Sequence, residues 1–151
     1  MSGVYLTVWD NEKPFNRVLQ PTEGGWPHIT VAYTGLKVTN DGLRDFAATL
    51  FDVVMQNQVT LTRAYVNSFQ YDSGEWRHDC LLEVDNATTA RVDDMRKSLK
   101  AKYPEQYNSF STNDPHVTVG IYSEQSAAQA RVDRLNEILP ITVDITGITI
   151  D

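Results

Sequence analysis

Along six stretches of the chain, apolar and polar residues alternate, which is the pattern of strands with one buried face. The opening stretch from Val4 to Trp9 shows it clearly, because every second residue is Val or Leu. The other strands are predicted over about 28–33, 59–69, 78–84, 116–119 and 141–150.

Three further stretches repeat apolar residues at the three- and four-residue spacing of a helix. They cover about 40–57, 86–103 and 123–139. Asn86 is expected to begin the second helix and Pro104 to end it, and Ser123 is expected to cap the third. Strands and helices mixed in this order predict an α+β fold.

One motif occurs twice in the predicted strands. Pro-His-Ile-Thr-Val begins at position 27 and Pro-His-Val-Thr-Val at position 115. Because alternate residues of a strand share a face, His28 would lie beside Thr30, and His116 beside Thr118. The duplication predicts two similar lobes related by a pseudo-twofold axis, each presenting an imidazole and a hydroxyl together.

Length, charge and cysteine content narrow the class of protein. The chain of 151 residues fits one domain over residues 1–151, and its formal net charge is −7. That charge disfavours long nucleic acids, whose binders carry basic surfaces, but permits a small anionic ligand in a local pocket. Cys80 is the single cysteine and is expected to be a buried, inert thiol. Without a membrane-length apolar run or a signal peptide, we expect a cytoplasmic monomer that does not bind membranes.

The two motifs resemble those of the 2H phosphoesterase superfamily, which carries two His-x-Thr/Ser motifs on paired strands. His-Ile-Thr at 28–30 and His-Val-Thr at 116–118 both match in full. The resemblance implies a bilobal α+β fold in which two antiparallel sheets face a central cleft and helices pack outside. The catalytic residues that it implies are His28, Thr30, His116 and Thr118.

Within that superfamily, the chain most resembles the phage anti-CBASS phosphodiesterases. The likeness lies in the short length, the acidic character and the opening Tyr-Leu-Thr-Val-Trp-Asp. Those enzymes degrade cyclic di- and oligonucleotide signals of a bacterial immune system without metal. The resemblance therefore implies a cyclic-oligonucleotide substrate, no cofactor, and the host cytoplasm as the site of action of a phage-encoded protein.

Two histidines suit the reaction that this resemblance implies. To cleave a 3′-5′ phosphodiester beside a free 2′-hydroxyl, one group takes the 2′ proton and another protonates the leaving 5′ oxygen. Imidazole titrates nearest neutral pH and can do either. Thr30 and Thr118 would donate hydrogen bonds to the non-bridging oxygens, where negative charge develops. The similarity of the two motifs leaves open which histidine is the base and which the acid.

Four residues are candidates for substrate binding. Tyr5 and Trp9 share the predicted polar face of the first strand, and Trp76 lies beside a glycine-containing turn, so each could stack on a base. Asp144, on the polar side of the last strand, could accept a hydrogen bond from a base or sugar or orient a histidine. The alternative for the aromatic residues is packing, and for Asp144 an ordinary solvated carboxylate.

Two other functions compete with this hypothesis. A 2′-5′ RNA ligase-like enzyme or 2′,3′-cyclic phosphodiesterase would act on RNA ends. A binding module would sequester nucleotides without turnover.

A zinc site is disfavoured, because zinc would need a third protein ligand and His78 is expected to pack instead. The segment from Glu105 to Asp114 is either a lid over the site or a plain loop.

Overall fold

The computed structural model describes residues 2–10, 18–19, 27–34, 41–42, 44–45, 47–48, 58–104 and 114–150. Every predicted strand is present, and so are the second and third predicted helices. Residues 41–42, 44–45 and 47–48 are helical, within the first predicted helix. The suggested lid lies outside the described residues except for Asp114. The elements are β1 Ser2–Trp9, β2 His28–Thr34, β3 Gln58–Gln70, β4 Trp76–Val84, α2 Asn86–Lys102, β5 His116–Tyr122, α3 Gln125–Asn136 and β6 Ile141–Ile150.

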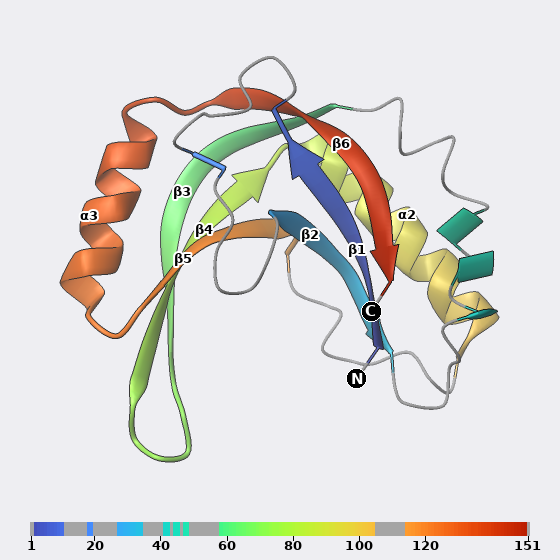
Figure 1. The fold of residues 1–151 in the computed structure, drawn as a ribbon, viewed down its shortest axis with the longest axis horizontal. Helices are drawn as coiled ribbons and strands as arrows, with labels where there is room; N and C mark the ends of the chain where they lie inside the picture. The colour runs from blue at the N-terminus through green and yellow to red at the C-terminus, as the bar shows by residue number, and fades with distance from the viewer. Residues whose placement is uncertain are drawn as a thin grey trace.

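The six strands form one antiparallel sheet, so the expectation of two facing sheets was wrong. The strand order is β1-β2-β5-β4-β3-β6, and β6 pairs again with β1, so the sheet closes on itself (Figure 1). The reason is the contact between the motif strands: Ile29 on β2 pairs directly with Val117 on β5. Antiparallel neighbours are related by a local twofold axis, so the duplication persists as a local symmetry about this contact.

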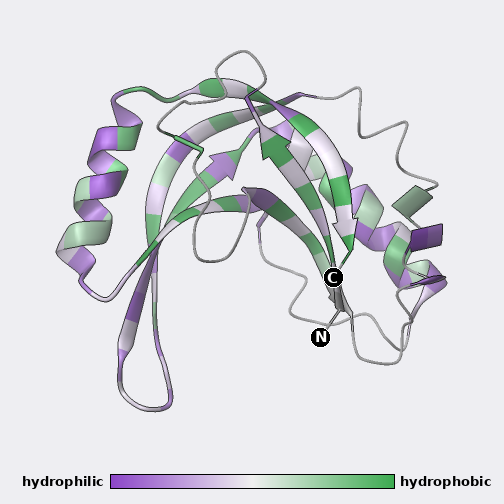
Figure 2. Cartoon of the chain, in the orientation of Figure 1, coloured by the Kyte–Doolittle hydropathy of each residue, from purple (hydrophilic) through white to green (hydrophobic). Residues whose placement is uncertain are grey.

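Much of the described core lies between one face of this sheet and helices α2 and α3. Hydrophobic and polar positions alternate along the strands (Figure 2), and the buried positions join the apolar sides of α2 and α3 in one cluster. Both helices lie on the outer side of the curved sheet (Figure 1). The sheet residues buried there include Val4, Leu6, Val8, Ile29, Val31, Val117, Val119, Val143 and Ile145.

Polar contacts near both the start and the middle of α2 fix the helix to the sheet. Asp85 caps the helix by accepting from the Thr88 backbone N–H at 3.1 Å, and it also accepts from the Thr60 backbone N–H at 2.9 Å. Farther along α2, Arg96 Nε donates to the Val31 carbonyl at 2.6 Å and a terminal nitrogen donates to the Thr30 carbonyl at 3.3 Å. The helix therefore supports the strand that carries the first motif.

Helix α3 is tied to β3 at its C-terminal end. The Asn136 side chain accepts from the Ala64 N–H at 2.8 Å and donates to the Ala64 carbonyl at 3.1 Å. The expectation that Ser123 caps this helix was wrong, because the N-cap position is Glu124, which makes no side-chain cap hydrogen bond. Among the described residues, no helix is both long and apolar enough to cross a membrane.

Candidate active site

The register of β2 against β5 sets the four motif side chains on one face of the sheet. Continuing the Ile29–Val117 pair by one residue in each direction puts His28 opposite Thr118 and Thr30 opposite His116. Residues directly opposite on antiparallel strands have Cβ atoms about 4.5–5.5 Å apart, and diagonal neighbours are about 7–8 Å apart. The two histidines thus occupy one diagonal of a small quadrilateral and the two threonines the other. We call this side of the sheet the motif face.

All four motif side chains are partly exposed, whereas the apolar residues between them are buried. His28, Thr30, His116 and Thr118 have intermediate exposure. Ile29 and Val117 are fully buried behind them. The alternation expected from the sequence is therefore present in both strands, and the polar groups remain open to a ligand.

A backbone contact fixes the orientation and tautomer of His116. Its Nδ1 lies 2.8 Å from the Asp114 carbonyl oxygen. A carbonyl can only accept, so Nδ1 carries the hydrogen and Nε2 of the neutral ring holds the lone pair. His116 is thereby prepared to take a proton at Nε2, and after doing so it can return one from the same atom.

Tyr5 packs against the other motif histidine. Its ring meets the His28 ring edge-on, with centroids 5.1 Å apart and an interplanar angle of 76°. Tyr5 also pairs with Thr30 across β1 and β2. Gly3 leaves the space that this ring occupies, because a Cβ at that position would collide with the Tyr5 side chain. Of the four candidate binding residues, Tyr5 is thus placed beside the motifs.

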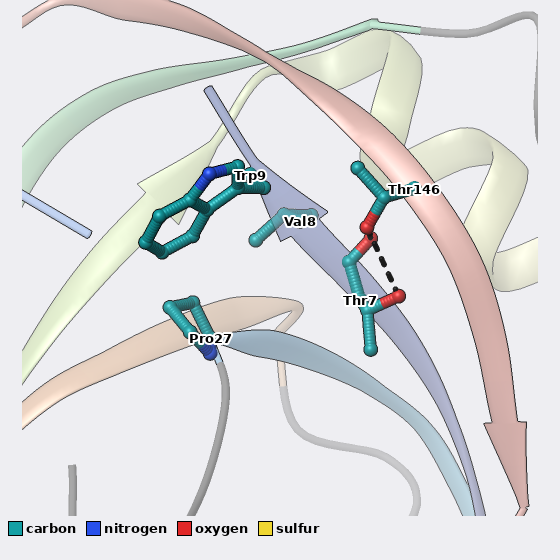
Figure 3. Close-up of a pocket in the computed structure, with 5 residues that line it drawn as sticks. All are labelled: Thr7, Val8, Trp9, Pro27 and Thr146. Carbon is teal, nitrogen blue, oxygen red and sulfur yellow. Dashed lines mark hydrogen bonds between the residues drawn. The ribbon is translucent and has the colours of Figure 1, made fainter. Parts of the chain in front are cut away.

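A pocket lies on the β1 side of the motifs (Figure 3). It has a volume of about 420 Å³ and is lined by Thr7, Val8, Trp9, Pro27 and Thr146. Trp9 and Pro27 lie to one side of it, and the Thr146 hydroxyl donates to the Thr7 hydroxyl at 3.2 Å on the other (Figure 3). Thr7 pairs with His28, so this pocket adjoins the first motif.

Asp144 lies at the edge of the same flank. It pairs with Trp9 on β1 and with Gln58 on β3. The Gln58 amide nitrogen lies 3.5 Å from Asp144 Oδ1. The register therefore brings Tyr5, Trp9 and Asp144 to the motif face, as the alternation along β1 and β6 predicts.

Trp76, the fourth candidate binding residue, does not lie on the motif face. From Ala64–Leu82 to Gln70–Trp76 the β3–β4 pairing has no register shift, so Trp76 shares a face with the buried Leu82 and not with Leu81. Leu81 is the residue that pairs with Thr118. Trp76 is 52% exposed on the hairpin that extends beyond the sheet (Figure 1), and its ring stacks on that of His78.

His78 and Cys80 are packing residues, as expected. His78 is 7% exposed, and its Nδ1 lies 2.6 Å from the Ser68 hydroxyl. Cys80 is fully buried, and this burial raises the pKa of its thiol to about 11. At neutral pH the thiol is therefore protonated and is a poor nucleophile. No group of three or more His, Cys, Asp or Glu side chains in the described part of the chain is arranged to hold a metal ion.

Sequence reasoning missed three residues on the β4 side of the motifs. Glu83 pairs with His116, and Arg63 pairs with Glu83. Tyr65 pairs with Leu81, the neighbour of Thr118. An extra residue in β3 and another in β5 shift the register, and no local pattern in the sequence announces which strand lies beside β5. The one local signal is that Arg63 and Glu83 are charged residues within mostly apolar parts of β3 and β4.

Comparison with known proteins assigns the family. The sequence model of the 2′-5′ RNA ligase superfamily matches residues 17–150. The chain belongs to the 2′-5′ RNA ligase superfamily. This membership confirms the resemblance to the 2H phosphoesterases at the level of the superfamily, a group of phosphoesterases.

Two solved structures are also similar to this chain. Kluyveromyces marxianus Usb1 with uridine monophosphate is 12% identical, with a TM-score of 0.47 over 91% of this chain and 80% of that one. A structure of Kluyveromyces marxianus Usb1 is 14% identical, with a TM-score of 0.47 over 99% and 96% of the two chains. No curated protein matches this superfamily member by sequence.

Proposed function

We propose that this protein is a metal-independent phosphodiesterase that cleaves the 3′-5′ bonds of cyclic di- or oligonucleotides. The observation that carries the proposal is the Ile29–Val117 pair, because it makes the two His-x-Thr motifs neighbours on one face of a sheet. Two imidazoles on diagonal neighbours, which are about 7–8 Å apart or slightly less between Cβ atoms, can reach opposite sides of one phosphate.

The reaction needs two proton transfers. One histidine takes the proton of the 2′-hydroxyl as its oxygen forms a bond to phosphorus. The bond from phosphorus to the 5′ oxygen breaks, and that oxygen receives a proton from the other histidine. Thr30 and Thr118 donate hydrogen bonds to the non-bridging oxygens of the phosphorane. The products are a 2′,3′-cyclic phosphate and a 5′-hydroxyl, and water can open the cyclic phosphate with the histidine roles exchanged.

The pocket beside the first motif supports a nucleotide as the substrate. Its volume of about 420 Å³ lies within the range of roughly 300–1,000 Å³ that is usual for small-molecule sites. Trp9 offers an indole for base stacking, Tyr5 adjoins the histidine, and Asp144 supplies an acceptor at the rim. Trp76 stays a prediction, and its place on the hairpin gives it no support. With a cyclic oligonucleotide as substrate, the protein would counter a bacterial cyclic-nucleotide immune system.

The family gives one specific reason for a second candidate. Its description refers to 2′-5′ RNA ligation, which favours an enzyme of RNA ends that makes or opens 2′-5′ or 2′,3′-cyclic linkages. The same histidines and threonines would serve, because the reacting atoms are again one phosphate and a neighbouring hydroxyl. The net charge of −7 favours the small cyclic substrate over long RNA.

A chromatographic screen in EDTA tests the proposal. Wild-type protein is incubated with 3′-5′ cyclic dinucleotides, 2′,3′-cyclic mononucleotides and short RNAs with 2′-5′ linkages. We expect cleavage of the cyclic dinucleotides that His116→Ala abolishes and that His78→Gln, which changes the third histidine, retains. Cleavage of the RNA ends alone would favour the second candidate. Stoichiometric retention of intact nucleotide by a folded wild-type protein would overturn catalysis and support a sequestering module.

A further inference from the structure

Arg63 is a cationic side chain close to the motifs that the proposed chemistry does not use. It lies on β3 in the cross-strand row Arg63–Glu83–His116. Strands are about 4.8 Å apart, so the Arg63 Cα lies about 10 Å from that of His116, within reach of a long side chain. In an acidic chain, a guanidinium on this face matters for a substrate that is itself an anion.

Two contacts hold the Arg63 side chain in place. Its Nε donates to Glu83 Oε2 at 2.8 Å, and its guanidinium carbon lies 5.0 Å from the centre of the Tyr65 ring. Glu83 Oε1 accepts a further hydrogen bond from the Thr62 hydroxyl at 3.2 Å. In the part of the chain that the structure describes, these contacts leave the terminal nitrogens of Arg63 without a hydrogen-bond partner. A planar guanidinium with two unused donor groups matches the geometry of a phosphate.

Tyr65 adds a neutral donor at the same position. Burial, aided by the negative charges of Asp114 and Glu83 and opposed by Arg63, raises the pKa of the Tyr65 phenol. The hydroxyl therefore stays protonated through the neutral and mildly alkaline range and can donate to an anion. Through Leu81, Tyr65 lies in the same cross-strand row as Thr118.

We propose that Arg63 and Tyr65 form a subsite for a second phosphate of the substrate. This inference rests on the proposed function, since it takes the reacting phosphate to lie between His28 and His116. The subsite defines the substrate class: a molecule with two phosphodiesters, cyclic or linear, is bound at both phosphates. A substrate with one phosphate, such as a 2′,3′-cyclic mononucleotide, reaches the histidines only.

The test compares Arg63→Gln with the wild type on both substrate classes. Gln keeps a donor for Glu83 but removes the charge. We expect kcat/KM for a cyclic dinucleotide to fall about tenfold, mainly through KM, because a charge-assisted hydrogen bond is lost. The value for a 2′,3′-cyclic mononucleotide should change less than about twofold, and Arg63→Lys should retain part of the activity on the dinucleotide. Arg134→Gln, an exposed charge on α3, is the matched control. Equal losses on both substrates, or none on either, would overturn the subsite.

A binding measurement separates this inference from the proposed function. In the His28→Ala background, affinity for the intact cyclic dinucleotide is measured as the salt concentration rises. Loss of one phosphate contact should lower the slope of log K against log salt in Arg63→Gln, because salt screens the charge–charge contact that this variant lacks. If no substrate is cleaved by the wild type, the proposed function fails, and an unchanged slope would then contradict the subsite as well. A reduced slope without cleavage would support the subsite in a binding protein.

Discussion

The two flanks of the motif face differ in chemistry although the motifs between them are nearly alike. On the β1 and β6 side, the described residues that line the pocket are all uncharged, namely Thr7, Val8, Trp9, Pro27 and Thr146. On the β4 and β3 side, Glu83 and Arg63 form an ion pair beside His116. The local twofold symmetry therefore ends one strand away from the motifs on each side.

Because the centre is symmetric and the flanks are not, the centre and the flanks can serve different tasks: proton transfer and orientation of the substrate. Under the proposed function, the symmetric centre would supply two equivalent proton carriers, which suits a reaction whose two steps exchange the acid and the base. The unlike flanks can orient a substrate in one direction only, since a base prefers the aromatic side and a phosphate the cationic side. Which histidine acts first would then follow from substrate orientation and not from the motifs.

The largest expected effect tests the symmetry of the centre. His28→Ala and His116→Ala should each lower kcat for the cyclic dinucleotide by about 10²–10⁴-fold, because each removes one proton transfer. A dinucleotide analogue with an aryloxy leaving group needs no protonation as it departs. One of the two variants, the one that lacks the acid, should recover most of its rate on this analogue. Recovery of both variants, or of neither, would show that the histidines do not have separate roles.

The next effect tests the uncharged flank. Trp9→Ala should raise KM about tenfold or more, since stacking on a base is worth roughly 1–3 kcal/mol. Unlike the effect of Arg63→Gln, this loss should be independent of salt concentration, because no charge is removed. Trp76→Ala is the matched control, because Trp76 lies on β4 on the side opposite to the motif face, and it should have little effect. A loss with Trp76→Ala as large as with Trp9→Ala would contradict this division of faces.

A smaller effect tests the support of the charged flank. Asp85 holds β3 to the start of α2. Burial by itself would raise the pKa of its carboxyl. The hydrogen bonds from Thr88 and Thr60 outweigh burial, so the pKa of Asp85 lies below its ordinary 3.8. Asp85→Asn replaces one acceptor with a donor and should cost about 1–2 kcal/mol of unfolding free energy at pH 7.

The pH dependence of that cost has a definite sign. A depressed carboxylate pKa stabilises the fold above the unfolded-state pKa, and the contribution is lost as the pH falls through the folded-state value. Urea denaturation should therefore show the difference between wild type and Asp85→Asn undiminished at pH 6–7 and reduced near pH 3. A difference that grew on acidification would contradict the assigned hydrogen bonds.

The smallest effect tests how closely the uncharged flank is packed. A Cβ at Gly147 would meet the Thr7 hydroxyl at 3.2 Å, so Gly147→Ala should displace Thr7 by a few tenths of an ångström. We expect a small rise in KM, about twofold, and a change in stability below about 1 kcal/mol. In the Thr7→Ala background the obstacle is absent, so Gly147→Ala should then have no further effect on KM. Additive effects would show that the two residues act separately.

Local patterns predicted the elements well and the pairing poorly. The alternation at Val4–Trp9 and at Ile141–Ile150 gave the strands and the buried side of each, including the place of Asp144 on the polar side. Trp76 was grouped with the binding residues because it lies beside the glycine-containing turn, and the sequence does not show which face of β4 it shares. The pairing that sets Glu83 beside His116, and Arg63 beyond it, joins β4 to β5, which are far apart in the chain, and it follows a register shift between Cys80 and Leu81.

The sequence alone determined the two His-x-Thr motifs, the faces on which their polar groups lie and the superfamily they indicate. Each of these depends on residue order within one strand, and a strand has a fixed period of two. Only the tertiary structure decided that β2 and β5 are neighbours in one closed sheet, and which residues flank them. Strand pairing is set by the packing of the whole core and by register shifts, which link residues that the chain order keeps apart.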